Sequence, residues 1–183
     1  MKIIFMVEEQ SMKEMLDIIL PKILPDDVES LIIPHNGKSD LQKSIPKKMR
    51  VWRSPGDKFI IIHDQHSNDC KSLKEDLKIL CQNSRNDFLI RIVCVELESW
   101  YFGDLDAVSR AYDENFVPIS LKRKYREPDR IANAKDELRK LVPTYQPISG
   151  AKKIAVHMNI NNNTSKSFKM FVSGVKKMCR ISR

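Results

Sequence analysis

Acidic residues and a histidine stand directly after three short hydrophobic segments of the chain. Glu8 follows IIFMV, Asp64 and His66 follow KFIIIH, and Glu96 and Glu98 stand at the end of FLIRIVCVEL. Several carboxylates in one place repel one another unless a cation offsets their charge, and divalent ions prefer oxygen ligands. If the three segments are neighbouring strands, these five side chains predict a site for Mg²⁺ or Mn²⁺.

Other polar residues of the same regions have a structural interpretation that weighs against metal binding. Asn68 or Asp69 is placed to cap the next helix, and His63 is of the type that packs as a hydrogen-bonded structural histidine. Glu9 fits an exposed acidic residue in a first helical turn, where the helix dipole favours it. Glu8 and Asp64 are therefore the strongest candidates for a functional role.

The hydrophobic segments predict the strands that position these residues. Short runs dense in Ile and Val predict strands over residues 3–7, 30–34, 58–63 and 88–97. Such continuous runs are typical of strands that helices cover on both faces. In a parallel sheet of this kind, the residues that follow the strands meet at one edge, where ligands bind.

One-sided hydrophobic spacing predicts a helix after each of the first three strands. The spacing runs from Met12 to Ile19, over residues 39–47 with Ser39 as cap, and from Cys70 to Leu80. Strands that alternate with helices indicate an α/β fold with a parallel sheet.

The second half of the chain has a helical pattern. Hydrophobic stripes over residues 104–112, 131–141 and 168–175 predict helices, and two prolines and a glycine predict a connection over residues 142–150. We expect a single domain over residues 1–183, with an α/β core over about residues 1–98 and a helical extension over about residues 99–183.

Composition limits the class of protein. A hydrophobic content of 42% with 31% charged residues fits a folded chain. The run IIFMV is shorter than a signal-peptide core, and no stretch approaches the roughly 20 apolar residues of a membrane span. The four cysteines form no C-x-x-C pair. We therefore expect a cytoplasmic protein with reduced thiols and no membrane partner.

The net charge of +8 favours a polyanionic partner. The candidates for nucleic-acid binding are Lys122, Arg123, Lys124, Arg126, Lys152 and Lys153. A solvated basic face without a specific partner is the alternative, because net charge reports on non-specific attraction and not on a site.

Five stretches together resemble an uncharacterised Toprim-like family of small prokaryotic proteins. They are IIFMVEEQSMKEMLDIILPKILP, HNGKSDLQKSIP, IIIHDQHSNDCKSLK, RIVCVELESWYFGDLDAV and NTSKSFKMF. The resemblance implies a four-strand parallel sheet between helices, with a glutamate after the first strand and Asp-x-Asp after the third. Glu8 and Asp64 match that pattern, whereas His66 stands in place of the second aspartate. Asp69, one turn further along, is the alternative.

The resemblance also implies an activity and a partner. Members are similar to one component of two-gene abortive-infection phage-defence systems, in which the other component is an AAA-type ATPase. The expected function is a metal-dependent nuclease or phosphotransferase acting on nucleic acid, with Glu8 as general acid/base or ligand and Asp64 as metal ligand. The rival hypotheses are a non-catalytic interaction module and an enzyme that acts on a small phosphorylated molecule.

Overall fold

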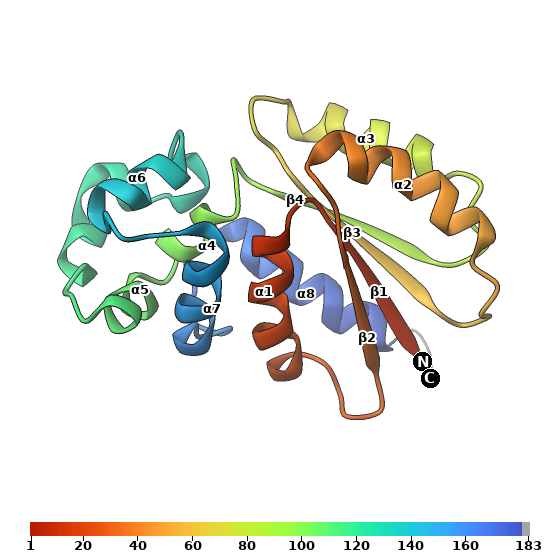
Figure 1. Cartoon of the computed structure of the whole chain (residues 1–183), viewed down its shortest axis with the longest axis horizontal. Coiled ribbons are helices and arrows are strands. Elements are labelled where there is room, and N and C mark those ends of the chain that lie inside the picture. Colours follow the sequence, from red (N-terminus) through yellow and green to blue (C-terminus); the bar gives the residue numbers. More distant parts are fainter. Residues whose placement is uncertain (181–183) are drawn as a thin grey trace.

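The computed structural model describes residues 1–180, and its first half alternates strands with helices (Figure 1). The elements are β1 (Lys2–Val7), α1 (Gln10–Ile19), η1 (Leu20–Lys22), β2 (Glu29–Pro34), α2 (Lys38–Val51), β3 (Lys58–Asp64), α3 (Cys70–Cys81) and β4 (Phe88–Val93). The strands form one sheet in the order β2-β1-β3-β4, and every pair is parallel. The predicted α/β fold with a four-strand parallel sheet is therefore confirmed.

The strand order contains a switch point between β1 and β3. From β1 the chain crosses to β2 on one side, and from β2 it crosses back to β3 on the other side. The two crossover helices consequently cover opposite faces of the sheet. A crevice opens at such a point beyond the carboxyl ends of the two strands, and ligands of open α/β sheets bind there.

Helices bury both faces of the sheet, which explains the unbroken hydrophobic runs. Ile3, Phe5 and Val7 of β1 belong to a core shared with α1 and α8, whereas Ile4 and Met6 pack with residues of α2 and α3. All five side chains are fully buried. A strand with water on one face would instead alternate polar and apolar residues.

The second half of the chain is helical, as predicted. Its elements are α4 (Glu98–Phe102), α5 (Leu105–Tyr112), η2 (Val117–Leu121), η3 (Arg123–Tyr125), η4 (Pro128–Arg130), α6 (Ala134–Leu141), α7 (Pro147–His157) and α8 (Lys166–Arg180). Helices α4 to α7 lie beyond the carboxyl ends of the strands, and α8 returns along the sheet (Figure 1). Within residues 1–180, no helix has the length and hydrophobicity needed to span a membrane.

Trp100 joins the helical region to the sheet. Its ring stacks on Phe171 with centroids 5.1 Å apart, and its Nε1 donates a hydrogen bond of 2.8 Å to Ser167 Oγ. The indole is fully buried, and both partners belong to α8, which packs on β4. This contact positions α4, and with it the end of the β4 connection, relative to the sheet.

Three local expectations were wrong. Strand β4 ends at Val93 and not at residue 97, because Val95 adopts a left-handed φ of 61° that turns the chain out of the sheet. Gly37, not Ser39, is the N-cap of α2; its φ of 88° suits glycine, and no side chain caps the helix. The predicted connection over 142–150 is shorter, because Pro147 occupies the first position of α7, where proline is favourable.

We expect Gly103→Ala to lower the free energy of unfolding by about 1–3 kcal/mol, the usual cost of overpacking. Gly103 has an ordinary φ of −70°, but an added Cβ would lie 2.1 Å from Asn163 Oδ1. Asn163 cannot move aside, because it is fully buried, donates to the Trp100 carbonyl and accepts from the Ser165 amide. Urea titration measures the loss.

Exposed Ser173→Ala, which adds no atom near a neighbour, is the control for helix substitutions. Equal unfolding free energies for the two variants would contradict the packing argument.

Candidate metal centre

Glu8 and Asp64 meet at the switch point of the sheet. Glu8 directly follows β1, and Asp64 is the last residue of the neighbouring strand β3. The Asp64 amide donates a 3.2 Å hydrogen bond to Glu8 Oε2. Both residues are buried, with 5% and 8% of their surface exposed. The parallel topology thus brings together two carboxylates that are 56 residues apart in the chain.

Glu8, Asp64 and His66 form a group that could hold a metal ion. One ligand atom from each residue lies within 4.8 Å of the other two. The His66 side chain is 36% exposed, so the group opens to solvent on the side of this imidazole. Two carboxylates and one imidazole suit a divalent ion that keeps water on its remaining positions.

The backbone of two loops directs His66 toward Glu8. His66 has a left-handed φ of 51°, its amide donates to the Val95 carbonyl at 2.8 Å, and its Nε2 lies 2.8 Å from Glu8 Oε1. Val95 is itself left-handed, which is a strained conformation for a β-branched residue and costs about 1–3 kcal/mol. The surrounding contacts therefore hold the imidazole in place against backbone strain.

His63 has the structural role that its position suggested. It is fully buried, its Nδ1 lies 2.6 Å from the Asp64 carbonyl and 3.2 Å from Glu8 Oε2, and its Nε2 faces the Gln42 amide nitrogen at 3.1 Å. This pattern corresponds to the tautomer with hydrogen on Nδ1 and an accepting Nε2. The ring therefore braces the Glu8 carboxylate from the side away from solvent.

Glu96 and Glu98 lie next to the three-residue group but do not belong to it. Glu98 begins α4, is 1% exposed, and accepts a 2.8 Å hydrogen bond from the Tyr145 hydroxyl. Glu96 accepts from the Lys135 amide at 2.7 Å. That they bind a metal ion stays a prediction. In the structure, each of these carboxylates has its own hydrogen-bond donor: the Tyr145 hydroxyl for Glu98 and the Lys135 amide for Glu96.

The helical region adds residues to this edge that the sequence pattern did not indicate. Lys135 of α6 has its amine 3.8 Å from Glu9 Oε2, and the hydroxyl of fully buried Tyr101 has no hydrogen-bond partner among residues 1–180. The hydrophobic stripe of α6 predicted its buried face only. No local signal shows that its lysine would reach strand ends more than 70 residues away.

Burial favours the protonated form of two carboxyl groups at this edge. The pKa of Asp64 is raised well above its usual value, first by burial and then by the charges of Glu8, Glu98 and Glu9. Burial also raises the pKa of Glu98. For Lys135, burial acts to lower the pKa, but the surrounding carboxylates outweigh it and raise the pKa. The Lys135 amine acts to lower the pKa of Asp64 but leaves it raised, so a divalent cation can stabilise this carboxylate where Lys135 does not suffice.

A comparison with family models places these residues within one matched region. The model described as a domain of unknown function (DUF4276) matches residues 7–176. The chain belongs to the DUF4276 family. Among curated proteins and solved structures, none matches it. The matched DUF4276 region includes Glu8, Asp64 and His66 as well as the helices that close over them.

Asp69 is a helix cap in this DUF4276 chain. Its Oδ1 accepts from the amides of Lys71 and Ser72 at 3.0 and 2.9 Å, as the N-cap of α3. The predicted cap is confirmed, and Asp69 is outside the three-residue group.

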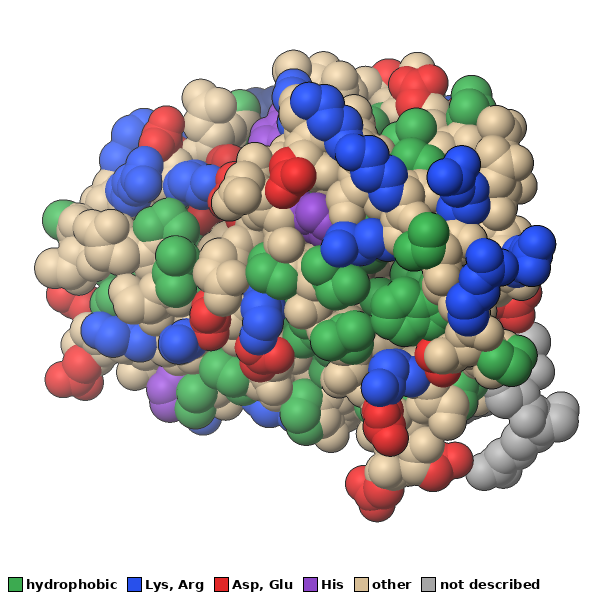
Figure 2. All heavy atoms as spheres, turned by 45° about the vertical axis from the view of Figure 1, so that its right-hand side comes forward, with side chains coloured by type: hydrophobic (Ala, Val, Ile, Leu, Met, Phe, Trp, Pro, Cys, Tyr) green, Lys and Arg blue, Asp and Glu red, His purple; other side chains and the backbone are tan. Residues whose placement is uncertain are grey.

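The basic residues proposed for nucleic-acid binding are not equivalent in the DUF4276 structure. Lys124 forms an ion pair with buried Glu137, and Lys152 pairs with Glu14 at 3.0 Å. Figure 2 shows Lys and Arg side chains in several groups, separated by acidic and hydrophobic ones on the same face.

The remaining predicted basic residues differ in their exposure and in their contacts. Lys122 and Arg123 are exposed, Arg126 Nε donates to the Leu121 carbonyl, and the Lys153 amine lies 5.6 Å from the centre of the Tyr112 ring. Lys122 and Arg123 are therefore the best placed to meet a polyanion.

We expect Asp64→Asn to stabilise the DUF4276 fold at neutral pH when chelator is present. The folded carboxyl has a raised pKa, so between its unfolded value near 3.9 and its folded value only the folded state holds the proton. The free energy of unfolding of the wild type therefore falls as pH rises through that window, by about 1.4 kcal/mol per pH unit, while the neutral amide is unaffected.

Urea titrations from pH 3.5 to 7.5 measure this difference. Asp69→Asn is the matched control, because asparagine also caps helices and Asp69 is exposed. Parallel pH profiles for wild type and Asp64→Asn would refute the assignment of Asp64 as the proton-binding carboxyl.

Proposed function

We propose that this chain is a metal-dependent nuclease or phosphotransferase of the Toprim type that acts on nucleic acid. The observation that carries the proposal is the group of Glu8, Asp64 and His66 at the β1/β3 switch point, with ligand atoms within 4.8 Å. A buried group with excess negative charge and one open side is suited to a divalent ion and to a phosphate that approaches it.

The position of the group supports the Toprim assignment. The Toprim pattern has a glutamate after the first strand and an aspartate after the third, and Glu8 and Asp64 follow strands that are adjacent and parallel. His66 occupies the place of the second aspartate of the pattern. Its imidazole faces the same glutamate at 2.8 Å, so the substitution keeps a donor atom at the centre.

Each side chain has a distinct task in this proposal. A divalent ion held here would supply a Lewis acid for the phosphate oxygens. Asp64 would hold the ion as a deprotonated carboxylate, and Glu8 would either share the ion or accept a proton from the attacking group. His66 would hold the ion through Nε2 only in the tautomer with its hydrogen on Nδ1, which gives up the hydrogen bond to Glu8, and the exposed side of this ring would be the side open to phosphate.

We expect the wild type to prefer Mn²⁺ over Mg²⁺, because Mg²⁺ strongly favours oxygen donors whereas Mn²⁺ accepts imidazole more readily. His66→Asp should restore an all-oxygen group and raise the affinity for Mg²⁺ and any Mg²⁺-supported cleavage. His66→Ala should lose Mn²⁺ binding, and Asp64→Ala should lose both ions. Calorimetric titration and cleavage of labelled DNA and RNA measure these changes, with Asp69→Asn as control.

Two outcomes would count against the proposal. Identical Mg²⁺ to Mn²⁺ affinity ratios in wild type, His66→Asp and His66→Ala would show that His66 is not a metal ligand. Metal binding without cleavage of any nucleic acid would support the metal centre but contradict the proposed nuclease activity.

Lys135 favours a second candidate, a non-catalytic interaction module. Its amine lies among the carboxylates and carries a pKa that Glu98 and Glu9 raise, so it already offsets part of their charge. Under this alternative the wild type binds no divalent ion, and Lys135→Gln creates a site for one. The resemblance to abortive-infection proteins adds an AAA-type ATPase as the partner, which co-purification tests.

We expect replacement of Lys122 and Arg123 by Gln to weaken nucleic-acid binding and to lower the slope of log affinity against log salt by about 1–2, since each lost phosphate contact removes about 0.9 from it. Lys124 is left in place, because its removal would strip a partner from buried Glu137. Anisotropy at a series of salt concentrations gives the slope.

Lys176→Gln with Lys177→Gln is the matched control for this charge change. Both residues are exposed on the last turns of α8, next to Met178, whose carbonyl accepts from Lys58 at the amino end of β3. They therefore lie at the opposite edge of the sheet from the candidate centre. An unchanged slope in the Lys122 and Arg123 variant would show that these two residues do not contact phosphate and only form a solvated basic face.

A further inference from the structure

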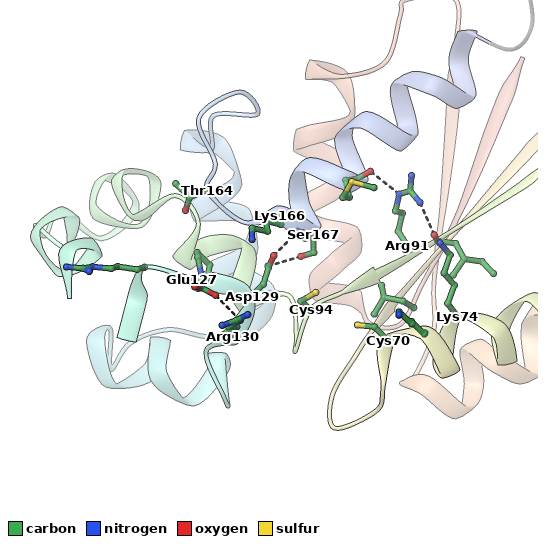
Figure 3. A pocket seen from close by; sticks show the side chains of 16 residues that line it. Cys70, Lys74, Arg91, Cys94, Glu127, Asp129, Arg130, Thr164, Lys166 and Ser167 are labelled. Carbon is green, nitrogen blue, oxygen red and sulfur yellow. Dashed lines mark hydrogen bonds and ion pairs between the residues drawn. The ribbon is translucent and has the colours of Figure 1, made fainter. Parts of the chain in front are cut away.

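A pocket of about 540 Å³ lies between the sheet and the helical region (Figure 3). One wall comes from the start of α3 and from β4, and the other from residues 126–130 and the first turns of α8. Its volume is within the range of small-molecule sites.

Part of the pocket wall is hydrophobic. Ile90 and Ile92 of β4 form it on the sheet side, and Pro128 and Met170 form it on the other side. This surface can cover the apolar part of a ligand. A small inorganic anion alone would leave it unused.

The rim of the pocket is strongly basic, with six basic and two acidic side chains. The basic ones are Lys71, Lys74, Arg91, Arg126, Arg130 and Lys166. Among residues 1–180, the amines of Lys71, Lys74 and Lys166 form no ion pair with any acidic group. Lys71 and Lys74 belong to α3 and Lys166 belongs to α8, so the lysines come from both walls of the pocket.

The two acidic side chains leave the rim with an excess of positive charge, and each of them is held by other partners. Glu127 pairs with Arg130 at 2.8 Å. Asp129 accepts from the Ser167 amide and from the hydroxyls of Ser165 and Ser167 at 2.6 to 2.9 Å, so it is bound to the start of α8, as Figure 3 shows for Ser167.

The two thiols of the pocket add no negative charge at neutral pH. Burial raises the pKa of the Cys94 thiol to about 11, and burial also raises the pKa of Cys70. Arg91 adds a fixed cation, since its Nε and Nη1 donate to the carbonyls of Met170 and Ile90. Gly174 makes room for it, because an added Cβ there would lie 2.3 Å from Arg91 Nη2.

The pocket and the candidate metal centre share the same pair of loops. The loop after β3 carries His66 and ends at Cys70, and the loop after β4 begins with Cys94 and Val95. The His66 amide donates to the Val95 carbonyl, which ties the two loops together. The imidazole faces Glu8 on one side, and both cysteines line the pocket on the other.

We propose that this pocket binds a nucleotide, with base and sugar against the hydrophobic walls and phosphate between Lys71, Lys74 and Lys166. A nucleoside phosphate combines the size, the apolar surface and the multiple negative charge that the pocket matches. A fatty chain would match the walls but would not need three amines from opposite sides. The inference goes beyond the proposed nuclease activity, because none of the residues of the metal group lines the pocket.

Calorimetry in chelator tests the proposal with three probes: adenosine monophosphate, inorganic phosphate and a 5′-phosphorylated single-stranded hexanucleotide. We expect nucleotide to bind more tightly than inorganic phosphate. Replacement of Lys71 and Lys166 by Gln should lower the affinity at least about ten-fold, the effect of losing hydrogen bonds to a charged group. Lys176→Gln with Lys177→Gln, at the other end of α8, should bind as the wild type does.

A second pair of variants separates charge from shape. Met170 is 58% exposed, so its replacement leaves the core intact. Met170→Asp places a negative charge on the pocket wall and should weaken nucleotide binding, whereas the nearly isosteric Met170→Asn should weaken it much less. Equal effects would show that the pocket does not bind an anionic ligand and would overturn the proposal.

The other outcomes each decide a point. Binding of the mononucleotide identifies a free nucleotide as the ligand, and binding of the hexanucleotide alone identifies a nucleotide of a nucleic-acid chain. Binding of neither, or equal affinity for nucleotide and inorganic phosphate, overturns the proposal. Asp64→Ala should lose metal but keep nucleotide binding, so failure of the metal centre and failure of the pocket are distinguishable.

Discussion

The burial of two carboxylates side by side is the constraint on which the rest of this edge of the sheet depends. Glu8 and Asp64 end adjacent parallel strands, so the fold cannot bring the strands together without bringing these charges together. The protein compensates with donors: the Asp64 amide, His63 and His66 all face Glu8. What remains uncompensated is the Asp64 carboxyl itself, whose pKa is raised by burial and by its acidic neighbours.

The helical region also affects the charge of this site, because it closes over the carboxyl ends of the strands. Trp100 packs on α8 and sets the position of α4, which places Glu98 against the hydroxyl of Tyr145. Helix α6 then brings Lys135 close to Glu9. The extension therefore contributes charged and polar groups to the candidate centre, while the His66 side chain stays 36% exposed.

The loops after β3 and β4 explain why two different features lie next to each other. Their pairing through His66 and Val95 requires left-handed backbone at both residues, which extended strands could not provide. The turn at Val95 ends β4 early and makes room for a pocket between the sheet and residues 126–130. The negative centre and the basic pocket thus lie on opposite sides of one short structural unit.

The sequence by itself determined the presence of the four strands, the helices between the first three of them and their successors, and the candidate side chains on the first and third strands. Dense Ile and Val runs define buried parallel strands because both faces are covered, and one-sided spacing defines the helices between them. Parallel pairing then forces Glu8 and Asp64 to one edge. Only the tertiary structure decided the end of β4, the separate partners of Glu96 and Glu98, and the approach of Lys135, because these depend on a left-handed turn and on helix packing across distant segments. Periodicity records which face of an element is buried, but not which distant charge will meet it.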